Sequence, residues 1–243
     1  MSVPRVYWPG ATPLDGRVEL TGDDAHRLRQ VLRLSPGDAL ALFDGRGHEW
    51  AGHVSSVTKQ AVEVSALEAV ESVAESRVPV TLAIGVLKGD QMDAVVRDAT
   101  MLGVAAIVPL RTAHVTVPPR AWQSGGAVER WQRVAIASAT QCRRAVVPDV
   151  RPVTDYETCL REPVALRLIC VEPGVAMPPG NWTSVAAPAS VHVLIGPEGG
   201  WSDAEVQQAL AAGAFAVSLG PRTLRAETAP IVALTLVSAA WGW

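Results

Sequence analysis

The stretch LIGPEGGWS, from Leu194 to Ser202, places glycine and proline directly after a short apolar run and directly before a helix-like pattern. A second stretch, LGPRTLRAETA from Leu219 to Ala229, repeats this arrangement further along the chain. Each apolar run predicts a strand, and glycine at its end lets a ligand approach the main chain closely. Ligands of open α/β sheets bind outside the carboxyl ends of the strands. The two turns therefore predict one ligand-binding crevice.

The composition indicates a globular chain. Of the 243 residues, 49% are apolar, which is enough for a sizeable core. The first ten residues contain an arginine and two prolines, so we expect no signal peptide. The most apolar segment, Ala229 to Trp243, is too short to span a bilayer and predicts a buried helix. The 3 cysteines and 5 histidines show no metal-ligand spacing, so we expect no metal site, no disulfide framework and a cytoplasmic protein.

The positive charge is clustered although the net charge is −3. Seven arginines lie between Arg111 and Arg151 against two acidic residues, and Arg27, Arg29 and Arg33 form a second cluster. Arginine suits bidentate contacts with phosphate groups and stacking on bases. The same bias also fits a genome of high G and C content, so the clusters leave nucleic-acid binding open.

The order of the expected elements predicts two domains. Up to about residue 75 the sequence alternates short strands and turns, with one helix at 23–34, and this pattern predicts a small β-barrel. From Val78 strands and helices alternate, which predicts an α/β domain with a mostly parallel sheet and helices on both faces. The expected strands cover 80–87, 104–110, 164–171, 191–195 and 214–219, and the expected helices 90–102, 126–144, 203–213 and 228–241.

The chemistry of the two turns narrows the ligand. GPEGG is neither a P-loop nor a dinucleotide fingerprint, and Pro197 removes one N–H donor. This favours a neutral or zwitterionic ligand over a triphosphate, and an ordinary tight turn is the alternative. In the second turn, Arg225 could hold a phosphate or stabilise a developing oxyanion. Glu227 is either functional or a carboxylate that stabilises the N-terminus of the next helix.

Several motifs in order along the chain resemble the RsmE family of SPOUT RNA methyltransferases. They are GPEGGWSDAE, LGPRTLRAETAP, LKGDQMD, LGV-x₃-VPL (Leu102 to Leu110) and Q-x-x-R-x-x-VPDV (Gln141 to Val150). The N-terminal residues His26, Val31-Leu32-Arg33, Gly37-Asp38 and Asp44-Gly45 also resemble that family's PUA-like domain. The resemblance covers nearly the whole chain.

The resemblance implies a PUA-like β-barrel that binds RNA at 1–74 and a SPOUT methyltransferase domain at 75–243, whose mostly parallel sheet ends in a trefoil knot. It implies a cytoplasmic homodimer that methylates N3 of a uridine in 16S ribosomal RNA of the small subunit, with S-adenosyl-L-methionine as cofactor and no metal. The cofactor pocket would be formed by Glu172, Ile195, Gly196, Pro197, Glu198, Gly199, Gly200, Leu219, Gly220 and Leu224.

Roles for the charged residues follow from the resemblance. We expect Arg225 to stabilise negative charge on the base or to orient it, and Glu227 to act as a structural anchor or proton acceptor. The expected RNA contacts are Arg27, Arg33, Lys88, Gln141 and Arg144. The chain departs from the family in having Met101 where a glutamate is usual and Cys142 where serine is usual. The alternatives are an inactive RNA-binding relative and a SPOUT enzyme that acts on another RNA, such as transfer RNA.

Overall fold

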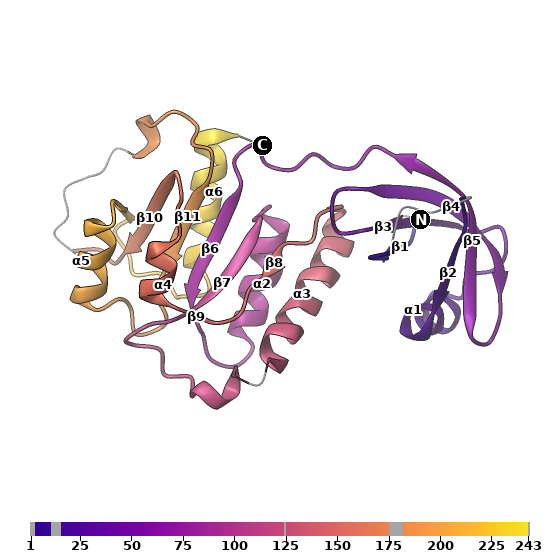
Figure 1. The fold of residues 1–243 in the computed structure, drawn as a ribbon, viewed down its shortest axis with the longest axis horizontal. Helices are drawn as coiled ribbons and strands as arrows, with labels where there is room; N and C mark the ends of the chain where they lie inside the picture. The colour runs from indigo at the N-terminus through magenta and orange to yellow at the C-terminus, as the bar shows by residue number, and fades with distance from the viewer. Residues whose placement is uncertain (1–2, 11–15, 124, 175–181, 243) are drawn as a thin grey trace. The chain divides into compact units, whose positions relative to one another are not determined.

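The computed structural model describes residues 3–10, 16–123, 125–174 and 182–242, and the chain divides into two compact units (Figure 1). The N-terminal unit comprises Met1–Val73 together with Ala139–Val147, and the C-terminal unit comprises Ala74–Ser138 and Pro148–Trp243. The sequence pattern had not indicated that a segment from the middle of the chain belongs with the N-terminal residues.

The N-terminal unit is built on a five-stranded sheet in the order β1-β3-β4-β5-β2. Its strands are β1 (Arg5–Tyr7), β2 (Val18–Thr21), β3 (Ala39–Phe43), β4 (Glu49–Val57) and β5 (Ala61–Val70). β1 pairs with β3 in parallel, and the other pairs are antiparallel. Among the described residues the pairing runs from β1 to β2 without closing on itself, so the predicted barrel is not closed by strand pairing.

One helical segment covers this sheet, where the sequence predicts a helix. α1 (Gly22–His26) continues directly into a π-helical turn, η2 (Arg27–Val31). Ala25 and Leu28 are buried and join the core that alternate residues of the strands form, including Leu20, Val62 and Val64. The period-2 pattern of burial in β2 and β5 is the alternation that the sequence shows.

The C-terminal unit contains a parallel sheet of seven strands in the part of the chain described. The order is β12-β10-β11-β6-β7-β8, with β9 also paired to β7. The strands are β6 (Val80–Gly85), β7 (Ala106–Arg111), β8 (Asp149–Val150), β9 (Thr154–Asp155), β10 (Leu166–Val171), β11 (Val191–Ile195) and β12 (Phe215–Ser218). β6 and β11 are buried throughout, as expected of central strands covered on both faces.

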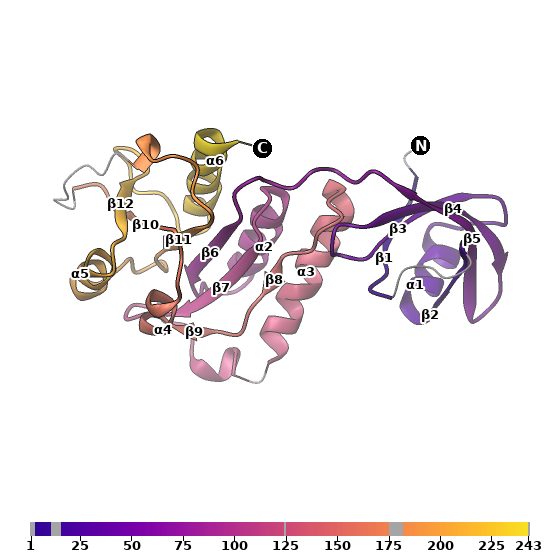
Figure 2. The ribbon, with the colours of Figure 1, turned by 45° about the horizontal axis from the view of Figure 1, so that its top comes forward.

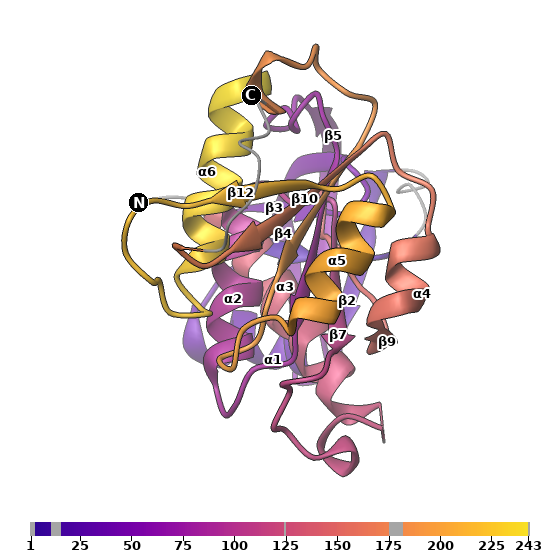
Figure 3. The same cartoon turned by 90° about the vertical axis from the view of Figure 1, so that its left-hand side faces the viewer.

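Helices cover both faces of this sheet, which confirms the predicted α/β class (Figure 3). The helices are α2 (Gln91–Met101), α3 (Gly126–Cys142), α4 (Tyr156–Arg161), α5 (Asp203–Ala211) and α6 (Ala229–Trp241), with short 3₁₀ turns η3 (Pro119–Ala121) and η4 (Trp182–Ser184). α4 and α5 pack on one face, and α2 and α6 lie together on the other (Figures 2 and 3). The short elements β8, β9 and α4 were not predicted, and the trefoil knot stays a prediction.

The topology places one edge of the sheet where a ligand can bind. From β6 the chain crosses through α2 to β7 on one side, while β11, β10 and β12 lie on the other side. The order of strands therefore changes direction between β6 and β11. In doubly wound sheets a crevice forms at such a point, outside the carboxyl ends of the strands. The GPEGG turn follows β11, and Lys88 follows β6, so both lie at this edge.

Candidate active site

A cavity of about 780 Å³ lies at this edge, and both glycine turns line it. All the predicted cofactor residues line the cavity except Gly220. The two predicted catalytic residues, Arg225 and Glu227, line it as well. The structure thus brings together two stretches that the sequence marks separately, and it adds Gln91, which the sequence analysis missed.

The GPEGG turn is fixed by contacts to three other segments. The backbone N–H of Lys88 donates to Oε1 of Glu198 over 2.9 Å, and Nδ1 of His114 is hydrogen-bonded to the carbonyl oxygen of Gly199 at 3.0 Å. The end of β6 approaches so closely that a Cβ added at Gly85 would lie 2.7 Å from the backbone nitrogen of Pro197. Glu198 therefore holds the turn in place through its side chain rather than only presenting its backbone to a ligand.

The start of α5 extends this fixed region. Ser202 and Glu205 form the predicted capping box, in which each side chain accepts from the other residue's backbone N–H. Oε1 of Glu205 also accepts a hydrogen bond from the backbone N–H of Ala113 at 2.8 Å. The hydroxyl of Tyr156 donates to the backbone carbonyl oxygen of Glu205. Nε1 of Trp201 donates to the carbonyl oxygen of Cys170. Because Glu205 is only 7% exposed, these hydrogen bonds are shielded from water.

The second turn presents its side chains to the cavity and to solvent. The side chain of Arg225 is 84% exposed, and its Nη1 lies 3.7 Å from Oε1 of Glu227, which is 23% exposed. Arg225 is therefore a residue of the cavity rim. Its carbonyl oxygen accepts from the backbone N–H groups of Thr228 and Ala229, at the start of α6. Glu227 precedes Thr228, the N-cap residue, so it does not occupy the capping position.

The lining of the cavity suits a zwitterionic molecule with an apolar ring. Carboxylates come from four residues and guanidinium groups from two, namely Glu172, Glu198, Asp203, Glu227, Arg222 and Arg225. Ile195, Leu219 and Leu224 supply apolar walls. Burial raises the pKa of the Cys170 thiol to about 12, so this cavity residue stays protonated and is a poor nucleophile.

The predicted RNA contacts divide by exposure. Arg27, Arg33, Lys88 and Gln141 are exposed. Arg144 is only 6% exposed, and its carbonyl oxygen accepts a hydrogen bond from Arg5. Its neighbour Arg143 is exposed and adopts a left-handed backbone conformation with a φ of 68°. The side chain that faces solvent in this segment is therefore that of Arg143.

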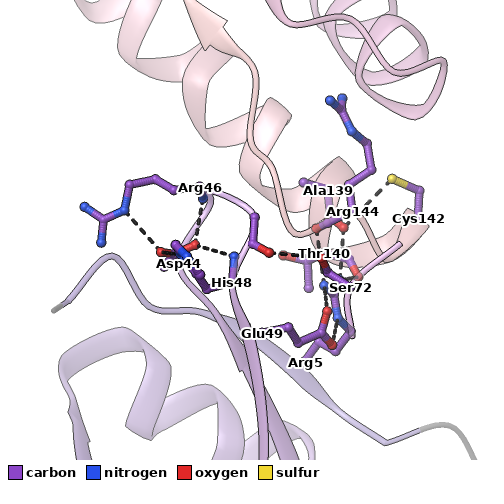
Figure 4. Close-up of polar contacts among 11 residues, drawn as sticks. Arg5, Asp44, Arg46, His48, Glu49, Ser72, Ala139, Thr140, Cys142 and Arg144 are labelled. Carbon is purple, nitrogen blue, oxygen red and sulfur yellow. Dashed lines mark hydrogen bonds and ion pairs between the residues drawn. The ribbon is translucent and has the colours of Figure 1, made fainter. Parts of the chain in front are cut away.

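Arg5 holds the segment 139–147 within the N-terminal unit (Figure 4). Its guanidinium group pairs with the carboxylate of Glu49 at 2.9 and 2.8 Å. It also donates to the carbonyl oxygens of Ala139, Thr140 and Arg144 at 3.1 to 3.2 Å. A cation at the C-terminal end of a helix satisfies carbonyl groups that have no partner inside the helix. Arg5 is thus a buried cap for the last turn of α3.

The β3–β4 turn also contacts this segment. Gly47 N–H donates to the carbonyl oxygen of Ala145, and Val147 N–H donates to that of Gly45. The turn is organised by Asp44, which accepts hydrogen bonds from Arg46 and His48 (Figure 4). Burial alone would raise the pKa of Asp44, but these hydrogen bonds hold it at about 2.

Several arginines of the cluster between Arg111 and Arg151 form ion pairs with acidic residues. Arg111 pairs with Asp155, Arg130 with Asp93, and Arg151 with both Asp149 and Glu162. Most of these partners lie outside the window in which the sequence analysis counted charge. In the described parts of the chain no helix is long and apolar enough to cross a membrane, and no group of His, Cys, Asp and Glu could hold a metal ion.

Comparisons with known proteins match both units. A model of the RNA methyltransferase domain covers residues 74–238, and one of the RNA methyltransferase PUA domain covers 20–67. Ribosomal RNA small subunit methyltransferase E of Synechocystis sp. is 36% identical over 93% of this chain and 74% of its own length. The protein of the same name from Bacillus subtilis is 29% identical over 90% of this chain and 88% of its own.

Two solved structures are similar over nearly their whole length. A putative methyltransferase from Legionella pneumophila in complex with the bound cofactor SAM has a TM-score of 0.89 and 32% identity, and covers 99% of this chain and 98% of its own. Ribosomal RNA small subunit methyltransferase E from Neisseria gonorrhoeae, bound to S-adenosyl methionine, has a TM-score of 0.89, 31% identity and the same coverage.

The fold, the crevice and the comparisons together define an RNA methyltransferase with an N-terminal PUA domain, as expected from the sequence. Within that class, the chain belongs to the ribosomal RNA small subunit methyltransferase E family, RsmE.

Proposed function

We propose that this protein transfers a methyl group from S-adenosylmethionine to N3 of a uridine in 16S ribosomal RNA of the small subunit. The observation that carries the proposal is the cavity at the carboxyl edge of the sheet, which both family motifs line with their predicted residues. The name of the relatives supports the ribosomal substrate, and two similar structures that hold S-adenosylmethionine support the cofactor.

The residues present fit this cofactor. Its ammonium and sulfonium groups are positive, and the carboxylates of Glu172, Glu198 and Glu227 line the cavity. Ile195, Leu219 and Leu224 provide the apolar surface that an adenine ring requires. Gly200 has a φ of 70°, and a Cβ there would lie 3.1 Å from Oε1 of Glu172, so the glycine leaves this carboxylate room beside the turn. These residues would hold the cofactor between the two turns.

The chemistry assigns different roles to the charged residues of the second turn. When bound, S-adenosylmethionine supplies an electrophilic methyl group, which the attacking nitrogen takes as the C–S bond breaks and its electron pair stays on sulfur. N3 of uridine must lose its proton for this attack, and the negative charge then spreads onto the two adjacent carbonyl oxygens. The Arg225 guanidinium group stabilises that charge. Glu227 orients Arg225 through their ion pair or accepts the proton.

The decisive experiment is mass mapping of methylated nucleosides after incubation of the protein with unmodified 30S subunits and labelled S-adenosylmethionine. We expect a single product, methylated on N3 of a uridine of 16S RNA. Methylation of another base or position, or of transfer RNA in a parallel reaction, would contradict the proposal. Calorimetry with S-adenosylmethionine separates an enzyme from an inactive RNA-binding relative, since the latter would show no binding at micromolar concentrations.

For the RNA contacts we propose the exposed Arg27, Arg33, Lys88 and Gln141, with Arg143 in the place of the buried Arg144. Each phosphate contact that is lost reduces the steepness with which salt weakens binding. We expect the double variant Arg27→Ala/Arg33→Ala to bind a 16S RNA fragment more weakly and with a shallower salt dependence. Arg161→Ala, which removes an exposed arginine outside the proposed set, is the matched control. Equal slopes for all three proteins would contradict the assignment.

We also propose that the protein acts as a cytoplasmic homodimer. α6 carries no charged residue, and its Ile231 and Leu236 are exposed, as is Met101 on the neighbouring α2. A second copy of this apolar surface would cover these side chains, and Met101 in place of glutamate keeps a charge out of it. Light scattering tests the proposal. We expect twice the mass of one chain, and a molar mass of 25.6 kDa, that of the monomer, would contradict it.

A further inference from the structure

Gln91 is a residue of the cavity for which neither the sequence motifs nor the reaction described above provides a role. It is the first residue of α2 and follows the turn Lys88-Gly89-Asp90 after β6. Its side chain lines the same cavity as the GPEGG and LRAETA turns. It therefore contributes a third wall, from an element that neither glycine turn belongs to.

The side-chain amide of Gln91 has an unusual environment. Its Oε1 atom is buried and has no hydrogen-bond partner among the residues that the structure describes. An unsatisfied buried acceptor is costly, and native proteins contain few of them. Because Oε1 is buried while Gln91 as a residue is only half-buried and lines the cavity, the NH₂ group is the polar end of this side chain that can face the cavity. In this arrangement the NH₂ group can donate a hydrogen bond to a molecule in the cavity, whereas the Oε1 atom accepts none.

The position of Gln91 favours the RNA base over the cofactor as the acceptor for this donor. The hydrogen bond between Lys88 N–H and Glu198 fixes the β6–α2 turn beside the GPEGG turn. Lys88 itself is exposed at the rim and is one of the proposed RNA contacts. Gln91 comes three residues further on, at the first position of α2, and lines the cavity. The cofactor is assigned to the two glycine turns, which leaves this third wall for the substrate.

We propose that the NH₂ group of Gln91 donates a hydrogen bond to O4, one of the two carbonyl oxygens adjacent to N3 of the target uracil, an inference that rests on the proposed function. In uracil O4 is an acceptor, whereas cytosine presents an amino group at that position. The donor therefore selects uracil over cytosine. It also gains strength as N3 loses its proton, because the negative charge then resides on the oxygen that it contacts. Gln91 thus acts together with Arg225 on the same charge.

The test compares Gln91→Met, which keeps the length of the side chain but removes the donor, with Gln91→Glu, which replaces it with a negative acceptor. Single-turnover methylation of unmodified 30S subunits is measured across pH, and S-adenosylmethionine affinity is measured by calorimetry. We expect Q91M to lower the rate by about 10- to 100-fold, as for a hydrogen bond to a charged group. Q91E is slower still, and Q91M reaches its maximal rate at higher pH than the wild type, because N3 loses its proton less readily.

We expect the S-adenosylmethionine affinity of both variants to lie within about threefold of the wild-type value. The matched control is Gln208→Met, which changes an exposed glutamine of α5 outside the cavity and should leave the rate unchanged. Three outcomes overturn the inference: a wild-type rate for Q91M, an unchanged pH profile, or a loss of cofactor affinity equal to the loss of rate. Thermal unfolding at the wild-type temperature shows that Q91M folds. Failure of the proposed function is distinct, since the wild-type protein itself would then form no methylated uridine.

Discussion

The two turns that line the cavity differ in how they are held. The GPEGG turn is tied to β6, to His114 and to the capped start of α5, and its glycines lie where added side chains would collide with neighbours. In the LGPRTLRAETA turn, the carbonyl oxygen of Arg225 accepts from backbone N–H groups at the start of α6, and the Arg225 side chain is 84% exposed. One wall of the crevice is thus shaped by packing, and the other presents a charged side chain.

This difference suggests a division of labour. A ligand held by backbone groups needs a wall that does not change shape, because its hydrogen bonds depend on fixed distances. A residue that stabilises charge on an incoming base needs only to be supported at its backbone, since the substrate completes its environment. We therefore expect changes in the GPEGG wall to affect cofactor affinity, and changes in the second wall to affect the rate of methyl transfer.

The largest effect is expected for Arg225→Ala. The variant should lower the single-turnover rate by about 10² to 10³, the usual loss when a group that stabilises a developing charge is removed. Its S-adenosylmethionine affinity and its unfolding temperature should remain those of the wild type, because the side chain is exposed and makes one long ion pair. Arg161→Ala controls for the loss of an exposed arginine. Methylation at the wild-type rate by R225A would remove the distinction between the two walls.

Gly85→Ala tests the packed wall. The new Cβ would lie 2.7 Å from Pro197, so the GPEGG turn has to move. Overpacking of this kind costs about 1–3 kcal/mol, which corresponds to an S-adenosylmethionine affinity about 5- to 150-fold weaker. Gly213→Ala is the control: it strains a left-handed backbone with a φ of 80°, but a Cβ there meets nothing within 4 Å. If both variants bound the cofactor equally well, the packing of the turn would not determine affinity.

A smaller effect, on stability, is expected for Asp44→Asn. Asp44 lies in a third turn, the β3–β4 turn of the N-terminal unit, and its side-chain hydrogen bonds organise that turn. The folded-state pKa of about 2 lies below the usual value near 3.9, so the carboxylate stabilises the fold above about pH 4. This contribution, about 2.5 kcal/mol, is lost as pH falls toward 2. Thermal unfolding should show D44N to be less stable at pH 7, with the difference narrowing at pH 3. If the loss of stability in D44N did not depend on pH, the charge of Asp44 would not be its cause. The control is Glu71→Gln, at an exposed glutamate, which should be as stable as the wild type.

Much of this architecture can be predicted from the sequence, because its signals are local. The strands expected at 80–87 and 191–195, the Ser202–Glu205 capping box and the glycine turns all depend on neighbouring residues. The structure has them, with the first strand ending at Gly85. β8 and β9 were missed because each has only two residues, too few to show a periodicity. The resemblance to a known family, rather than any period, supplied the cofactor and the substrate.

What could not be predicted depends on contacts between distant parts of the chain. The arginines at 111 and 130 have partners at 155 and 93, so a count of charge within one window overstated the local positive charge. Gln91 lies within the LKGDQMD motif, but a glutamine indicates no particular chemistry by itself, so its place in the cavity and its unpaired oxygen become evident only in the structure. The burial of Arg144 likewise follows from its packing within the N-terminal unit.

The contact between Arg5 and the end of α3 has a consequence for how the polypeptide folds as it is synthesised. The N-terminal unit contains residues 139–147, and Phe43 packs with Ala139 and Ala145 in a small apolar cluster. In a nascent chain that has emerged only up to Val73, Phe43 and the Arg5 guanidinium lack their contacts with this segment. Translation adds about 5–20 residues per second, so the closing segment follows several seconds later. Chaperones therefore meet this domain incomplete, and fragments that end at the first domain boundary are expected to aggregate.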